Sequence, residues 1–109
     1  MTDIPEKAFQ TQVLTLARWY AWRIQHTRPA QYRSGRWATP IQGHAGFPDL
    51  VLAHSTHGLI FAELKSARGK VSEAQTKWIE TLRAAGAEVH IWRPADLQNI
   101  ATRLSGKEI

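Results

Sequence analysis

The sequence predicts one α/β domain over residues 1–109, with a mixed β-sheet flanked by helices in the order α-β-β-β-α-β-α. Three observations lead to this fold class. Apolar residues recur at helical spacing between residues 5 and 22, and two apolar runs at 48–54 and 58–65 are joined by a turn-type sequence. A strand–helix–strand unit then spans residues 58–92, which implies a right-handed crossover between two parallel strands.

The first half of the chain should hold one helix, one strand and one long loop. The helix runs from about Pro5 to Trp22, with Asp3 as its N-cap and Glu6 in its first turn. Residues 22–28 alternate between apolar and polar as a strand does, and Pro29 ends that strand. Residues 29–47 are polar and form a single long loop, and a loop of this length in a compact domain is often functional.

The second half should begin with two paired strands and continue into a capped helix. Ser72 and Gln75 resemble a capping box that opens a helix from Glu73 to Ala85, and Gly86 ends it. Residues 89–92 make another strand, and a last helix runs from residue 94 to about residue 104.

The composition favours an anionic partner. There are 14 Lys and Arg residues against 9 Asp and Glu, which gives a net charge of +5, although many basic proteins bind no nucleic acid. The positive charges flank two acids, Asp49 and Glu63, rather than forming a tail. The chain has no cysteine, which excludes disulfides, thiolate catalysis and Cys-based zinc sites.

We expect a soluble, cytoplasmic protein with no membrane partner. The first residues lack the basic region and the apolar run of a signal peptide. No apolar stretch approaches the roughly 18 residues that a membrane-spanning helix needs.

Two acids and a lysine stand at the ends of the two paired strands. Asp49 opens one apolar run, Glu63 closes the other, and Lys65 follows two residues later. Carboxylates on adjacent strand ends can share Mg²⁺ or Mn²⁺, and the carbonyl of Leu64 is a candidate third ligand. Glu63 and Lys65 should face the same side, so that the ammonium can orient an attacking water and balance phosphate charge. The alternative is a surface Glu–Lys pair beside an unrelated turn aspartate.

Three segments resemble the VRR-NUC (virus-type replication-repair nuclease) domain, a branch of the PD-(D/E)xK nuclease superfamily. They are Gly46-Phe-Pro-Asp49-Leu-Val-Leu, Phe61-Ala-Glu63-Leu-Lys65 and Ser72-Glu-Ala-Gln75-Thr-Lys-Trp78. The resemblance covers nearly the whole chain, from Glu6 to the last helix, and implies a restriction-endonuclease-like core. In it, Asp49, Glu63 and Lys65 match the catalytic signature directly.

The resemblance also implies an activity and further site residues. Glu6 matches the acid that completes the metal site, and Gln75 matches a glutamine near the active centre. The implied protein is a Mg²⁺- or Mn²⁺-dependent, structure-selective DNA endonuclease. Short stand-alone members, typical of phages, resemble dimeric Holliday junction resolvases, so we expect a homodimer that cuts four-way junctions and acts in the cytoplasm of a bacterial host if it is phage-encoded.

Contacts to the DNA backbone are expected from a set of basic residues around the two acids: Arg33, Arg36, His44, Arg68 and Lys70. Trp37 lies in the polar loop and either stacks on an unpaired base or packs the loop onto the body. The other tryptophans fit core or dimer-facing positions. His54 and His57 are expected to serve the turn between the paired strands.

Two other functions stay open at this stage. A catalytically inactive module that has kept a nuclease fold would bind DNA without cutting it. A restriction-type endonuclease would share the chemistry but cleave linear duplex at fixed sites.

Overall fold

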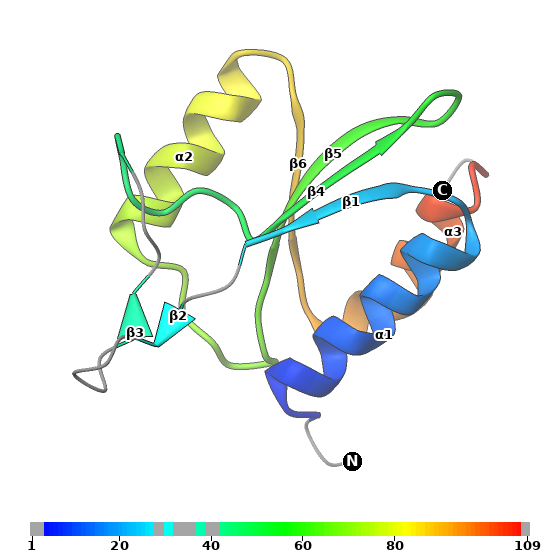
Figure 1. Ribbon diagram of the computed structural model, residues 1–109, viewed down its shortest axis with the longest axis horizontal. Helices are drawn as coiled ribbons and strands as arrows, with labels where there is room; N and C mark the ends of the chain where they lie inside the picture. The colour runs from blue at the N-terminus through cyan, green and yellow to red at the C-terminus, as the bar shows by residue number, and fades with distance from the viewer. Residues whose placement is uncertain (1–3, 28–29, 32–36, 39–41, 108–109) are drawn as a thin grey trace.

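The computed structural model describes residues 4–27, 30–31, 37–38 and 42–107. A four-stranded sheet in the order β1-β4-β5-β6 lies between helices (Figure 1). Helices α1 (Glu6–Trp19) and α3 (Leu97–Leu104) lie side by side on one face of the sheet, and α2 (Glu73–Ala84) lies on the other. The predicted mixed α/β fold is confirmed.

The sheet has the predicted pairing. β1 (Arg23–His26) and β5 (Gly58–Leu64) each run antiparallel to β4 (Leu50–His54), whereas β6 (Glu88–Trp92) runs parallel to β5. Helix α2 makes the crossover between the two parallel strands. The hairpin turn between β4 and β5 is held by His54, whose Nδ1 accepts the backbone N–H groups of Thr56 and His57 at 3.1 Å each, so both histidines serve the turn as predicted.

Helix α1 is shorter than the sequence predicts. Its N-cap is Pro5, which offers no side-chain cap, and Asp3 lies outside the described residues. At the other end the helix stops at Trp19, because Ala21 adopts a φ of 65° that a helix does not allow. The backbone N–H of Trp22 then donates to the carbonyl of Ala17 and turns the chain into β1.

The expectation of one uninterrupted loop over residues 29–47 is wrong in part. Two-residue strands β2 (Ala30–Gln31) and β3 (Trp37–Ala38) form a small antiparallel sheet of their own. Strands of this length are too short to produce an alternating pattern, so periodicity could not reveal them.

Side chains alternate between two apolar layers along the sheet. Ile60, Ala62 and Leu64 of β5 point toward α1 and α3, where they join a core of fully buried residues that includes Phe9 and Leu104. The intervening side chains of β5 point toward α2.

The tryptophans separate into buried and exposed positions. Trp22 and Trp92 lie in the core as predicted, and the indole N–H of Trp22 donates to the carbonyl of Leu104 at 2.8 Å. Trp78 is half-buried on α2, whereas Trp19 is 80% exposed and so does not belong to the core. The side chain of Trp37 lies outside the described residues. In the described parts of the chain, no helix has the length and apolar character to span a membrane.

Candidate active site

The antiparallel pairing of β4 and β5 brings the two predicted acids together. Leu50 pairs with Ala62, so Asp49, one residue before β4, lies beside Glu63, one residue further along β5. The N–H of Leu64 donates to Oδ2 of Asp49 at 3.1 Å, which fixes this carboxylate at the end of β5. The hydrogen bond also places the Leu64 backbone beside the Asp49 carboxylate.

Glu63 is a buried carboxylate, 2% exposed, on the face of β5 that α2 covers. Lys65 follows β5 with its N–H bonded to the carbonyl of Trp92, and its Nζ lies 3.5 Å from Oε2 of Glu63. Because the lysine side chain is also largely buried, at 14% exposure, this is not the solvated surface pair that was the alternative.

Gln75 joins the first turn of α2 to Glu63. Its Oε1 accepts the N–H of Ser72 at 2.9 Å, and its own N–H donates to the Ser72 hydroxyl at 3.1 Å, which completes the predicted capping box. The remaining amide group, Nε2, donates to Oε2 of Glu63 at 2.8 Å. The cap therefore fixes the direction in which the amide points, so the residue both starts α2 and orients the buried acid.

Gly46 permits the close approach that places α2 over the acids. Its φ is +96°, and a Cβ there would lie 2.5–2.7 Å from backbone atoms of Ala74 and Gln75. Any side chain would push the 46–49 segment away from the first turn of α2. This glycine is part of the Gly-Phe-Pro-Asp motif, but the motif alone did not reveal its packing role.

Burial strongly perturbs the charge of Glu63. Desolvation by burial and, to a lesser extent, the neighbouring Asp49 raise the pKa of its carboxyl group to about 8, although Lys65 opposes the shift. Its Oε2 is bonded to Gln75, whereas Oε1 is buried with no hydrogen-bond partner among the described residues.

These residues fit a divalent metal ion. An unpaired buried carboxylate oxygen is costly, and here it lies beside a second carboxylate. Hard oxygen ligands of this kind suit Mg²⁺ or Mn²⁺, whose charge would compensate both acids. Asp49, Glu63 and the carbonyl of Leu64 are thus the candidate ligands.

Glu6 does not join this set. It is exposed on the first turn of α1, and its Oε2 accepts a hydrogen bond from Gln10 Nε2 at 3.4 Å. The described parts of the chain contain no group of three His, Asp or Glu side chains able to hold a metal. The structure therefore does not bring Glu6 together with Asp49 and Glu63 as the resemblance implies.

Of the residues predicted to contact DNA, three are described by the structure. Arg68 and Lys70 are exposed in the segment that follows Lys65, and His44 is exposed near the start of α2. Arg33 and Arg36 lie outside the described residues.

Sequence reasoning missed the residue that holds the segment after Lys65. Nη1 of Arg93 donates to the carbonyls of Ser66 at 2.7 Å and Gly69 at 2.8 Å, with a longer contact to Ala67. Arg93 lies just beyond β6, so these contacts join segments 24 to 27 residues apart. The sequence carried no sign of them.

The sheet topology and the acid–lysine cluster are consistent with a PD-(D/E)xK-like core. Residues 17–96 match the family model of the VRR-NUC domain, and the chain belongs to this family. A nuclease-type, DNA-processing function follows from that membership.

A solved structure described as a VRR_NUC domain protein has the same fold. It superposes with a TM-score of 0.61, and the match covers 98% of this chain and 93% of the other at 19% sequence identity. No match is found among curated proteins.

Proposed function

We propose that the protein is a divalent-metal-dependent endonuclease that hydrolyses phosphodiester bonds of DNA at the Asp49–Glu63–Lys65–Gln75 site. The buried Glu63 carboxylate is the observation that carries this proposal. It has one oxygen without a hydrogen-bond partner in the part of the chain that the structure describes, a second acid beside it and a lysine 3.5 Å away. A protein needing only stability would gain nothing from such a group.

Each residue has a distinct part in this proposal. Asp49 and Glu63 would hold the metal together with the carbonyl of Leu64. When bound, Mg²⁺ or Mn²⁺ would supply the positive charge that polarises a phosphoryl oxygen and lowers the pKa of an attacking water. Lys65 neutralises the negative charge that develops on the phosphate and orients the water. Gln75 keeps the Glu63 carboxylate in one orientation.

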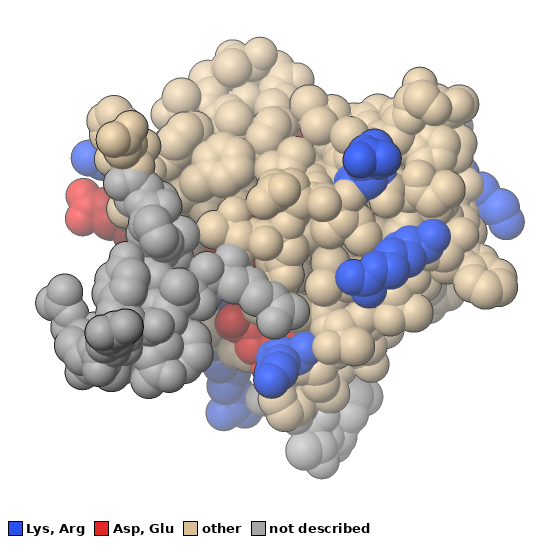
Figure 2. All heavy atoms as spheres, viewed as in Figure 1, with Lys and Arg blue, Asp and Glu red and all other residues tan. Residues whose placement is uncertain are grey.

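The substrate proposed is branched DNA, cut as a four-way junction by a homodimer. One site per chain means that symmetric cutting of two strands needs two copies related by a two-fold axis. The net charge of +5 favours DNA, and Lys and Arg side chains border a small acidic patch on the face in Figure 2. Contacts to phosphates would give selection by DNA shape rather than by sequence.

A cleavage assay with Mg²⁺ or Mn²⁺ tests the function. Four-way junctions, flaps, linear duplex and single strands are compared for the wild-type protein, Glu63→Gln, Lys65→Ala and the distant control Lys107→Ala. We expect metal-dependent cutting that prefers junctions, lost at least 100-fold in the first two variants and unchanged in the control.

The same assay distinguishes the alternatives. Cutting of linear duplex at fixed sites would show that the protein is a restriction-type endonuclease and not a junction-cleaving one. Tight DNA binding without cutting at any metal concentration would indicate the inactive module. Full cleavage activity of both Glu63→Gln and Lys65→Ala would contradict the proposed mechanism.

A further inference from the structure

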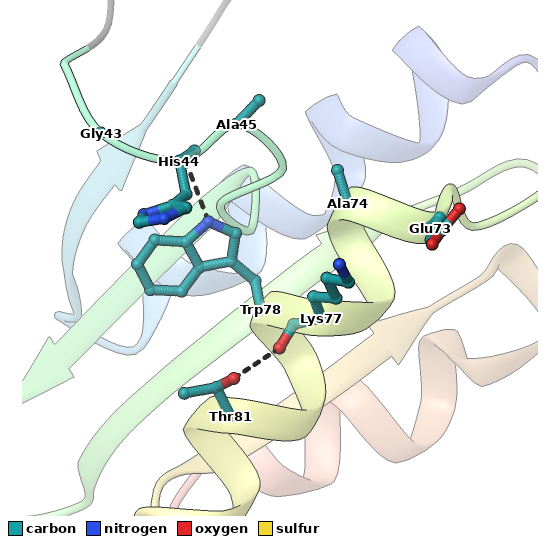
Figure 3. A pocket seen from close by; sticks show the side chains of 8 residues that line it. All are labelled: Gly43, His44, Ala45, Glu73, Ala74, Lys77, Trp78 and Thr81. Atoms are coloured by element: carbon teal, nitrogen blue, oxygen red, sulfur yellow. Dashed lines mark hydrogen bonds between the residues drawn. The ribbon is translucent and has the colours of Figure 1, made fainter.

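A hollow lies between α2 and residues 43–45, and none of the residues that line it belongs to the candidate active site. It has a volume of about 940 Å³, within the range of roughly 300–1,000 Å³ that ligand sites occupy. Figure 3 shows it between α2 and the segment that precedes Gly46. The lining residues that matter here are His44, Lys77 and Trp78, joined by Glu73 and Thr81.

Residues that line the hollow lie next to residues of the candidate active site. Trp78 follows Gln75 by three residues on α2, so the two side chains lie about one helical turn apart on neighbouring parts of the helix surface. Phe47, two residues before Asp49, packs edge-on against Trp78 at 4.9 Å between ring centroids. A DNA strand with one phosphate at the acids would therefore have a neighbouring nucleotide within reach of the hollow.

The polar edge of the indole is already satisfied. Trp78 Nε1 donates to the backbone carbonyl of His44 at 3.1 Å, which fixes the ring orientation. The indole is half-buried, and the exposed imidazole of His44 lies next to it (Figure 3). The hollow therefore exposes an aromatic surface, the indole of Trp78, which is held in one orientation by its hydrogen bond to the backbone of His44.

A positive charge stands beside this aromatic surface. Lys77 is exposed and lines the hollow, while its backbone carbonyl accepts the Thr81 hydroxyl at 2.8 Å. The carboxylate of Glu73 lies at the far end and points away from Trp78 (Figure 3). Aromatic rings next to a cation are the combination that binds single-stranded nucleic acid, since the base stacks and the phosphate pairs with the charge.

We propose that this hollow binds one unpaired nucleotide of the DNA strand that is cut, next to the phosphate at the acids. The proposal rests on the DNA endonuclease function proposed above. A second copy of this chain is the weaker occupant, because it would bring its own excess positive charge toward Lys77, whereas DNA brings negative charge.

Abasic substitution provides the test. The inactive Glu63→Gln protein is titrated with junction and single-stranded DNA in which one nucleotide at a time, around the cleaved phosphate, lacks its base. We expect binding to weaken about tenfold when one particular position is abasic, the size that stacking of a single base contributes. The other positions should change binding less than twofold.

Variants of the hollow then assign that position. His44→Ala retains the carbonyl that holds Trp78, and Trp78→Leu removes the ring. In the Trp78→Leu background the abasic position should no longer matter, and His44→Ala should reduce its effect in part. Lys77→Ala should weaken binding of every DNA about equally, and by more than Lys107→Ala, which removes the same charge far from the hollow.

Three results would overturn the inference. A uniform abasic scan, with metal-dependent cleavage intact in the wild-type protein, would overturn the nucleotide site and leave the proposed function standing. An abasic effect that persists unchanged in Trp78→Leu, with its fold verified by circular dichroism, would place the base elsewhere. Loss of all DNA binding and cleavage in the wild-type protein would instead reject the proposed function, and the nucleotide site with it.

Discussion

Replacing Glu63 with glutamine should stabilise the metal-free protein at alkaline pH while removing its cleavage activity. The wild-type carboxyl group is buried, and its pKa is raised to about 8 by desolvation and by Asp49. A glutamine has the same shape. Its carbonyl can accept the hydrogen bond from Gln75, and its amide can face Asp49 without charge.

The direction in which pH changes the stability follows from the number of protons that the folded and unfolded states bind. The unfolded carboxyl group has a pKa of 4.5, so between pH 4.5 and about 8 the folded protein holds a proton that the unfolded chain has lost. Stability from this group is therefore complete below pH 4.5 and is lost as the pH rises through about 8. The glutamine has no such dependence.

The magnitude can be bounded from the same shift. The difference between 4.5 and about 8, at about 1.4 kcal/mol per unit, gives a ceiling of about 5 kcal/mol. Because Asp49 is only half-buried, solvent reaches the site and screening reduces this ceiling. We expect the variant to be more stable than the wild-type protein by about 2 kcal/mol. For a domain of this size that corresponds to a difference of about 8 °C in Tm at pH 9.

Thermal unfolding in the presence of a chelator, at pH 5 and at pH 9, measures this difference. Glu63→Gln and the wild-type protein should have similar Tm values at pH 5, and the variant should be more stable at pH 9. Adding Mg²⁺ at pH 9 should raise the Tm of the wild-type protein alone, because binding to the folded state adds stability.

Glu88 provides a control of opposite sign. Its hydrogen bonds to Arg103 lower the pKa of its carboxyl group, so its contribution is present above pH 4.5 and is lost in acid. Glu88→Gln should therefore destabilise the protein at pH 9 and have less effect as the pH falls. Parallel Tm profiles for Glu63→Gln and the wild-type protein across this pH range would refute the reasoning.

Three further changes test the parts that hold the site. Gly46→Ala should lower the free energy of unfolding in urea by about 3 kcal/mol and abolish cleavage, because its Cβ would clash with the backbone of α2. Gly43→Ala has a similar positive φ but nothing within 4 Å of its Cβ, so it should lower the free energy of unfolding by about 1 kcal/mol. Equal losses in the two variants would contradict the clash. Gln75→Glu should keep the helix cap but tighten Mg²⁺ binding measured by calorimetry, since it places a further carboxylate beside Glu63; unchanged affinity would remove Gln75 from the site. Arg93→Ala should make residues 65–70 sensitive to limited proteolysis and destabilise the protein by about 2 kcal/mol, because it removes the carbonyl contacts of that segment; resistance equal to the wild-type protein would show that other contacts hold it.

Local chemistry made much of the fold predictable. The hairpin of β4 and β5 follows from alternation and a turn sequence, and the capping box of α2 follows from Ser72 and Gln75. The meeting of Asp49 with Glu63 then follows from the antiparallel register. Each of these signals lies within about 15 residues of chain.

Features that depend on long-range packing were not predictable. Whether Glu6 reaches the acids depends on how α1 rests on the sheet, and the sequence placed it only on the first helical turn. The contacts of Arg93 join distant segments, and the close approach of Gly46 to α2 depends on a backbone distance that no pattern encodes. The end of α1 was set by one unusual residue, Ala21, with positive φ.

The double hydrogen bonding of Gln75 ties the beginning of a helix to the state of a buried acid. If the first turn of α2 frays, Oε2 of Glu63 loses its hydrogen bond from Gln75 and the carboxylate is no longer covered by the helix. If Glu63 moves, the Gln75 side chain that caps the helix loses the hydrogen bond that holds its amide in place. Amide hydrogen exchange at residues 74–76 should therefore slow when Mg²⁺ binds, whereas exchange near the end of α2 should not change. Local order at the helix start thus becomes a reporter of metal occupancy, readable without any DNA present.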